Sequence, residues 1–176
     1  MSPLIHRSLT LQEAQILHEE LKTTPNILGY TVSELLGFQE ALIAEEAGAF
    51  AGVCLSKDLR SGWTDIAALY VLPPFRGRGL GTELYLAAWQ RAEERGRHIV
   101  TLSRNPTVVS LMERSGMEVS PSMRNAPFAL HLHMQCHMAS LYRTWEMLRK
   151  FRAMRNAPPL HCGVKRFPLP DATRRD

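Results

Sequence analysis

A glycine-rich segment over residues 71–82 is the pattern with the clearest chemistry in this sequence. It reads Val-Leu-Pro-Pro-Phe-Arg-Gly-Arg-Gly-Leu-Gly-Thr, so two prolines end a strand and three alternate glycines open a helix. Residues without a Cβ atom let several backbone N–H groups point at one place, where the dipole of the following helix adds partial positive charge. With Arg76 and Arg78 beside it, the segment predicts a binding site for an anion such as a pyrophosphate.

Other interpretations of this segment fit its residues less well. A tight strand-to-helix turn without a ligand explains the glycines but not their position beside two arginines. A Rossmann fingerprint requires G-x-G-x-x-G and an acidic residue about 20 positions later, whereas the spacing here is G-x-G-x-G. A Walker A loop requires Gly-Lys followed by Ser or Thr, which this segment lacks.

The elements around the segment alternate between strands and helices. Capping boxes at residues 10–13 and 31–34 predict the starts of two helices, the first over residues 11–22. Further elements follow from periodicity and turn residues: strands at 4–9, 63–72, 98–102 and 128–136, a hairpin at 42–55, and helices at 79–95 and 107–114. This order predicts an α/β fold in which a mixed sheet carries helices on its faces.

Residues 76–81 match the R/Q-x-x-G-x-G/A loop of the GNAT acetyltransferase superfamily. Residues 69–73 resemble the family's fourth strand, residues 42–55 its second and third strands, and residues 105–117 its helix N-x-x-A-x-x-L-Y-E-x-x-G-F. The resemblance covers residues 4–137 in the right order. It implies a mixed, mostly antiparallel sheet of six or seven strands, splayed between strands 4 and 5 and flanked by about four helices.

The resemblance also implies acetyl-CoA in the splayed cleft, as the acyl donor. Backbone groups of Leu69 and Val71 would pair with the pantetheine arm as an added strand does, and Asn105 would face the pantetheine or the adenosine. The loop would hold the pyrophosphate. Its implied binding residues are Arg76, Gly77, Arg78, Gly79, Leu80, Gly81 and Thr82.

The family transfers the acyl group directly: an amine attacks the thioester, a base removes its proton, and an acid protonates the thiolate. Met112 stands where a tyrosine acid is usual, and a thioether cannot donate a proton. Val100 stands where the alanine acetyltransferases of ribosomal proteins carry glutamate. Asp65 lies eleven residues before Arg76, where members of the histone-acetyltransferase type carry a glutamate. The resemblance therefore implies Asp65 as the general base.

Counting in twos along the strand places Asp65 on the same face as Leu69 and Val71, at the edge that contacts the cofactor. Its side chain is one methylene shorter than glutamate, so a water molecule could relay the proton. The alternative is that Asp65 only solvates the start of the strand. Tyr70, Ser103 and water are the candidates for protonating the thiolate.

Metal-ligating residues do not gather in this sequence. His131, His133 and His137 share one face of the strand expected over residues 128–136. At about 3.3 Å per residue the outer two are roughly 20 Å apart and cannot share a metal, and no third ligand accompanies the other pair. The three cysteines have no CxxC spacing, so neither a disulfide framework nor a metal site is expected.

The net charge of +4 is unevenly distributed, because nine basic and only three acidic residues lie between 139 and 176. We expect residues 1–138 to form the acetyltransferase domain. Residues 139–176 are expected as a basic helix to about Asn156 and a proline-rich tail. An apolar stripe at helical spacing would dock this helix on the domain or on a second subunit in a homodimer. The stripe consists of Leu141, Trp145, Leu148, Phe151 and Met154.

The composition is that of one average globular domain, with 176 residues of which 45% are hydrophobic and 22% charged. No apolar stretch reaches the roughly 18 residues of a membrane span, and no signal peptide begins the chain, so a cytoplasmic protein without membrane contact is expected. The basic tail lacks an RNA-binding motif, and nucleic acid is not expected as a partner.

These observations predict an enzyme of EC 2.3.1 type, an acyl-CoA-dependent N-acetyltransferase. It would move an acetyl group from acetyl-CoA to a small primary amine or a peptide N-terminus. The alternative is a CoA-binding module with degenerate catalysis that acts through its basic tail. Met112 and Val100 favour that alternative, and the intact loop with Asp65 favours the enzyme.

Overall fold

The computed structural model describes residues 4–24, 29–138, 142, 145, 148, 150 and 158–168. Strands and helices alternate along this part of the chain. In order, they are β1 (Leu4–His6), α1 (Leu11–Thr23), α2 (Val32–Leu36), β2 (Glu40–Glu46), β3 (Ala49–Asp58), β4 (Trp63–Val71), the 3₁₀ turn η1 (Pro73–Phe75), α3 (Leu80–Glu94), β5 (His98–Ser103), α4 (Pro106–Arg114), β6 (Glu118–Ser120), α5 (Phe128–Met138) and β7 (His161–Lys165).

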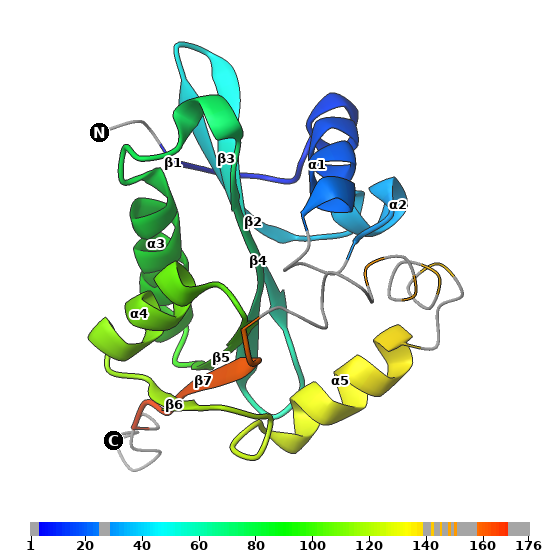
Figure 1. Cartoon of the computed structure of the whole chain (residues 1–176). Coiled ribbons are helices and arrows are strands. Elements are labelled where there is room, and N and C mark those ends of the chain that lie inside the picture. The colour runs from blue at the N-terminus through cyan, green and yellow to red at the C-terminus, as the bar shows by residue number, and fades with distance from the viewer. Residues whose placement is uncertain are drawn as a thin grey trace, which may run out of the picture.

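The seven strands form one sheet in the order β1-β2-β3-β4-β5-β7-β6. Every neighbouring pair is antiparallel except β4 and β5, which run parallel. Helices α3 and α4 cover one side of the sheet, whereas α1, α2 and α5 lie on the other (Figure 1). The predicted α/β fold, with a mixed and mostly antiparallel sheet, is confirmed.

The capping boxes begin the first two helices where the sequence predicts them. Thr10 and Glu13 exchange side-chain and backbone hydrogen bonds at the start of α1, and Thr31 and Glu34 do the same at α2. Arg7 fixes the first box through two hydrogen bonds to the Glu13 carboxylate, at 2.6 and 2.7 Å. These bonds lower the pKa of Glu13 to about 2. They also connect the start of α1 to the residue that follows β1.

The sheet divides the hydrophobic core. Tyr85 of α3 and Met112 of α4 are fully buried against one face, and Leu17 of α1 is fully buried against the other. A third cluster lies under α5, where Leu130 packs with Val100 of β5. The parallel pair β4 and β5 therefore has packed helices on both sides.

Residues 128–138 form helix α5, so the strand predicted over 128–136 is wrong. Burial follows the helix: Leu130 is fully buried, whereas Phe128 and Leu132 are 81% and 45% exposed. Because residues two apart on a helix point in different directions, His131 and His133 do not share a face as the strand would require. The side chain of His137 lies outside the described part of the structure.

Strand β7 extends the sheet beyond the domain boundary expected at residue 138. It pairs with β5 on one side and with β6 on the other, so part of the expected tail is a central strand. Its sequence, His-Cys-Gly-Val-Lys, is too short between prolines to stand out from the chain alone.

The helix expected over residues 139–156 is described at four positions, which are helical. Trp145 and Leu148 of the expected apolar stripe are 59% and 71% exposed. Lys150 is buried, and its Nζ donates to the Leu21 carbonyl at 2.7 Å. At these positions the apolar side chains are exposed and the lysine is buried. Trp145 and Leu148 therefore do not dock the helix on the domain's own sheet. The other stripe residues, Leu141, Phe151 and Met154, lie outside the described residues.

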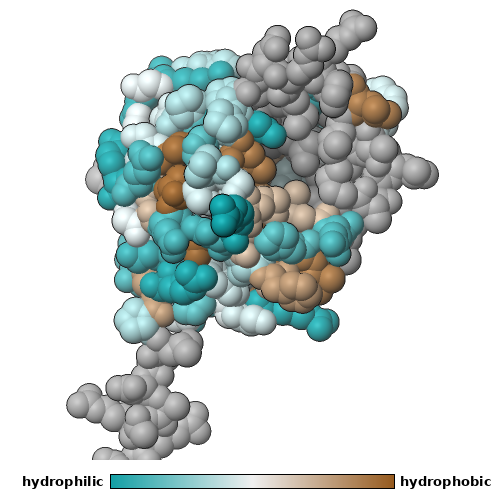
Figure 2. Space-filling view, turned by 60° about the horizontal axis from the view of Figure 1, so that its bottom comes forward, coloured by the Kyte–Doolittle hydropathy of each residue, from teal (hydrophilic) through white to brown (hydrophobic). Residues whose placement is uncertain are grey.

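The surface in Figure 2 is mostly hydrophilic, and its apolar residues form small separate patches. Such isolated patches are usual on a folded domain. Among the described residues, no helix is long and apolar enough to cross a membrane.

Candidate active site

The glycine loop lies between β4 and α3, and its backbone conformation explains two of its glycines. Gly77 and Gly79 have φ angles of 77° and 84°, which strain any residue with a Cβ atom. A Cβ at either position would meet no other atom within 4 Å, so the backbone and not the available space requires glycine. Gly81 has no such φ, and a Cβ there would contact only Val71, at 3.7 Å.

Five consecutive amides of the loop, at residues 77–81, are without an acceptor. Within the described residues none of these N–H groups donates a hydrogen bond, whereas those of Thr82 and Glu83 donate to the Gly79 carbonyl at 2.9 and 3.1 Å. Free amides at the N-terminus of a 15-residue helix favour a bound anion. The loop therefore has the donors that a pyrophosphate needs.

The two arginines of the loop are held by neighbouring groups. Arg76 donates from Nε to the Val71 carbonyl and from Nη2 to the Tyr70 hydroxyl, both at 2.9 Å. Arg78 donates to the carboxylate of Glu46, the last residue of β2, at 2.5 Å. The sequence does not indicate Glu46, since a pairing between the end of a strand and a distant loop leaves no local pattern.

Strands β4 and β5 are paired at one end and separate at the other. Their register joins Trp63–Ile66 to His98–Thr101 and goes no further. The Thr101 hydroxyl donates to the Ile66 carbonyl at 2.9 Å, at the point where the pairing stops. In the described residues, 67–71 have no strand partner on the β5 side, so the strands splay apart as the family resemblance implies.

The backbone groups of Leu69 and Val71 face this cleft. The Leu72 amide donates to Ala51 of β3 at 2.9 Å, and backbone groups in an antiparallel pair alternate between the two sides of the strand. Residues at odd positions just before Leu72 therefore point away from β3. The Val71 carbonyl accepts from the Arg76 side chain, so this edge and the loop are joined.

A β-bulge in β4 places Asp65 on a different face from the one predicted. The register between β3 and β4 skips Ala67, and one extra residue reverses the alternation of side chains. Leu69 and Val71 pack on the α3 side. Asp65 pairs with Val100, whose side chain is buried on the α5 side. The expectation that Asp65 shares a face with Leu69 and Val71 is therefore wrong.

Asp65 is a buried carboxylate, with 7% of its surface exposed. Burial raises its pKa to about 7, although the positive charge of Lys57 acts in the opposite direction. No described residue donates a hydrogen bond to it. A carboxylate with a pKa near neutrality suits a general base at physiological pH.

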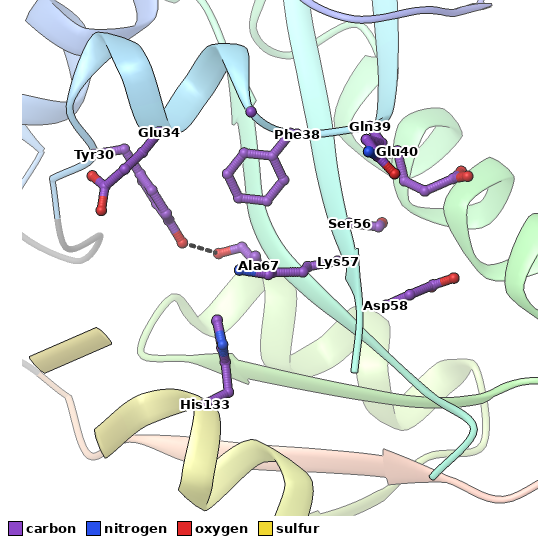
Figure 3. Close-up of a pocket in the computed structure, with 11 residues that line it drawn as sticks. Tyr30, Glu34, Phe38, Gln39, Glu40, Ser56, Lys57, Asp58, Ala67 and His133 are labelled. Carbon is purple, nitrogen blue, oxygen red and sulfur yellow. Dashed lines mark hydrogen bonds between the residues drawn. The ribbon is translucent and has the colours of Figure 1, made fainter. Parts of the chain in front are cut away.

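A cavity of about 530 Å³, which we name the α2–α5 cavity, opens between α2, the bulged part of the sheet and α5 (Figure 3). Tyr30 and Phe38 form an aromatic wall, and the Tyr30 hydroxyl donates to the carbonyl of Ala67 at 3.4 Å. His133 reaches the cavity from α5 on the opposite side (Figure 3). Asp65 does not line this cavity, but its cross-strand partner Lys57 does.

A second cavity of about 320 Å³ lies between α3 and α4. It begins at Thr82, directly after the loop, and continues past Leu86 and Trp89. Leu111 and Arg114 form its wall on α4. A molecule bound at the loop could therefore extend a second group into this cavity.

Neither of the two departures from the family pattern supplies a reactive group. Met112 is fully buried, and a Cβ at Gly163 of β7 would lie 3.0 Å from its Sδ, so β7 packs tightly over it. Val100 is fully buried as well. Among the described residues, no three potential metal ligands gather.

The remaining candidates make local hydrogen bonds. Asn105 caps α4 by accepting from the Thr107 amide at 2.9 Å, and the Ser103 hydroxyl accepts from the Asn105 amide at 3.1 Å. Tyr70 donates its hydroxyl proton to Glu20 at 2.6 Å. Burial and this carboxylate raise the pKa of Tyr70, which weakens it as an acid.

This chain is similar to known proteins both in sequence and in structure. Residues 11–117 match the family model described as Acetyltransferase (GNAT) family. No curated protein sequence matches the chain. N-acetylglutamate synthase from Neisseria gonorrhoeae, complexed with coenzyme A and N-acetyl-glutamate, has 19% identity and a TM-score of 0.65 over 94% of this chain. The match covers only 35% of that synthase.

Two further solved structures match nearly the full length of both chains. Rv2747 from Mycobacterium tuberculosis, in complex with CoA and NLQ, is 16% identical with a TM-score of 0.66, over 93% of this chain and 99% of that one. The ribosomal-protein-S18-alanine N-acetyltransferase from Escherichia coli is 11% identical with a TM-score of 0.63, over 99% and 100%. These likenesses show the fold, and the family match covers more than half of the sequence. The chain belongs to the GNAT acetyltransferase family.

Proposed function

We propose that this protein is an acetyl-CoA-dependent N-acetyltransferase that moves an acetyl group to a primary amine. The observation that carries the proposal is the row of free amides at residues 77–81, which adjoins the unpaired edge of β4. Structures of two similar proteins, the Neisseria synthase and Rv2747, contain CoA. Both support CoA as the ligand of this arrangement.

In this proposal the donor lies along the loop and the open strand edge. The amides of the loop hold the pyrophosphate, and Arg76 and Arg78 supply nearby positive charge. The backbone groups of Leu69 and Val71 pair with the pantetheine arm. Asn105, at the start of α4, borders the arm on the far side of the cleft. The cavity between α3 and α4 leaves room for the adenosine.

The acetyl group moves by direct attack of the amine on the thioester carbon. Asp65 takes a proton from the nitrogen, a C–N bond forms, and the C–S bond breaks. The thiolate takes its proton from water, because Met112 has none to give and the Tyr70 hydroxyl is bound to Glu20. The amine approaches from the α5 side of the sheet, the side on which the bulge places Asp65.

The test is CoA binding by a pair of glycine variants with the same backbone strain. Gly79→Glu puts an anion into the loop, and it should abolish the thermal stabilisation by CoA. Gly48→Glu is the control, because Gly48 also has a positive φ, 78°, and an open surround, but lies in the turn after β2. If Gly79→Glu is still stabilised by CoA as the wild type is, the loop is not the site.

A CoA-binding module without catalysis is the alternative, and the buried Met112 in place of an acid favours it. Release of free thiol in the presence of an amine panel distinguishes the two. Turnover of any amine supports the enzyme, and CoA binding without turnover supports the module.

We also propose that the protein forms homodimers through the surface around α5. Half of the large apolar side chains that the described residues expose lie between 128 and 148. They are Phe128, Leu132, Trp145 and Leu148. Exposed apolar side chains of this size favour contact with a second subunit.

A further inference from the structure

The acidic side chains that line the α2–α5 cavity are already engaged. Glu40 contacts Arg91 and Arg95 at 3.1 and 3.2 Å, and Asp58 contacts Arg95 at 3.0 Å. The Glu34 carboxylate accepts the amide that begins α2, at 2.8 Å. The acids are thus balanced by arginines or committed to the backbone, and they do not make the cavity a site for cations.

Lys57 is a charged lining residue without such a partner. Within the part of the chain that the structure describes, it forms neither an ion pair nor a hydrogen bond. Figure 3 shows its side chain extending from β3 along the cavity toward Ala67. Its ammonium group is therefore available to an anionic group on a bound molecule.

Lys57 and Asp65 are direct cross-strand partners in the register of β3 and β4. Side chains of such partners leave the same face of the sheet, with Cβ atoms about 4.5–5.5 Å apart. They do not form an ion pair with each other in the described structure. A cation that lines the cavity and a buried carboxylate behind the lining are thus direct neighbours, so a molecule whose anionic group is bound by Lys57 would have its amine close to Asp65.

The size of the cavity indicates a small acceptor. Its volume of about 530 Å³ lies within the range of roughly 300–1,000 Å³ typical of small-molecule sites. The aromatic wall of Tyr30 and Phe38 leaves apolar surface for the rest of such a molecule.

We infer that the acceptor is a small amine that also carries a carboxylate, which Lys57 binds while the amine faces Asp65. This inference rests on the proposed N-acetyltransferase function and names the substrate class of the same site. The proton that leaves the nitrogen goes to Asp65, so recognition and proton transfer use different groups.

The experiment compares amines that differ only in the carboxylate. L-leucine, L-leucinamide and isopentylamine form one series, and 4-aminobutyrate and butylamine form a second with a longer spacing. Initial rates of thiol release from acetyl-CoA give kcat/KM for each. We expect the carboxylate compound of at least one series to be preferred about tenfold or more, which corresponds to a charge-assisted contact.

Variants at position 57 assign this preference to the lysine. Lys57→Met keeps the length of the side chain and should remove the preference, mainly by raising KM for the carboxylate compound. Lys57→Glu should instead favour a diamine such as 1,4-diaminobutane. Lys22→Met is the control: Lys22 is on α1, where it contacts Glu19 at 2.7 Å, and it should keep the wild-type preference.

The outcomes separate this inference from the proposed function. If the wild type acetylates the plain amines as well as the carboxylates, the inference is wrong and the proposed function stands. A uniform loss across all amines in Lys57→Met would also refute it, because Lys57 would then act only through Asp65. If no amine is acetylated although CoA binds, the proposed function fails, and the inference fails with it.

Discussion

Replacing Asp65 by asparagine should make the protein more stable at neutral pH, although it removes the proposed base. The side chain keeps its shape and loses its charge. In the unfolded chain the carboxyl has its ordinary pKa of 3.8, whereas burial raises the pKa to about 7 in the folded protein. Between these two pH values the folded state binds more protons than the unfolded state, so stability falls as the pH rises through this window.

The size of this effect follows from the pKa difference. One pKa unit corresponds to about 1.36 kcal/mol, so the charged carboxylate costs the folded protein on the order of 4 kcal/mol above pH 7. Below about pH 4 the carboxyl is protonated in both states, and the cost disappears. The variant should therefore match the wild type at pH 4 and gain on it steadily up to about pH 7.

Urea unfolding at pH 4, 5.5, 7 and 8 measures this difference. Asp58→Asn is the matched control, on the neighbouring strand, where Asp58 contacts Arg95 and Arg97 at 3.0 and 3.1 Å near the surface. It should lose up to about 1 kcal/mol at neutral pH, opposite in sign to the change at position 65. A difference between wild type and Asp65→Asn that does not vary with pH would refute the argument from burial.

The same variant should lose acetyl transfer by about 10²–10⁴-fold while CoA binding is unchanged, as expected for a general base. Greater stability together with lower activity would identify Asp65 as a residue kept for function at a cost to the fold. Activity within about threefold of wild type across the pH range would instead remove Asp65 from the mechanism.

Three further predictions concern the loop, α4 and the surface around α5. Glu46→Gln should release Arg78 and tighten CoA binding up to about fivefold in low salt by calorimetry; weaker binding would mean that the ion pair helps to shape the loop. Met112→Tyr should lower the stability by about 1–3 kcal/mol, as measured by thermal unfolding, because the larger side chain overpacks against Gly163. A variant with unchanged stability and faster acetyl transfer would contradict this. Phe128→Ser should halve the mass found by light scattering if α5 forms the dimer contact, and an unchanged dimer would place the contact elsewhere.

The loop and the helices before and after it could be predicted because their signals are local. Thr10 and Thr31 each stand three residues before a glutamate, and this spacing alone determines where α1 and α2 begin. The glycines at 77 and 79 likewise match a backbone conformation that other residues rarely adopt. In each case the signal depends only on residues that are neighbours in the chain, so the sequence alone is enough to predict the local structure.

The errors concern features that depend on distant residues. Alternating apolar residues at 128–136 fit a strand as well as a helix that is buried at Leu130 and exposed at Phe128, and the core decides between them. The bulge at Ala67 is a property of the register between two strands, so counting along one strand cannot detect it. The proposed role of Lys57 likewise follows only from that register, which pairs it with Asp65.

The position of β7 has a consequence for how the protein is made. Strands β5 and β6 lie on either side of it, but β6 is synthesised about 40 residues earlier and β5 about 60 residues earlier. Until residue 165 has left the ribosome, the nascent chain carries two open strand edges that have no partner, and such edges readily pair with other chains. Closing the sheet also requires a contact between residues far apart in sequence, which slows folding. The synthesis of β7 therefore completes the sheet, and a chain cut between β6 and β7 exposes both edges permanently.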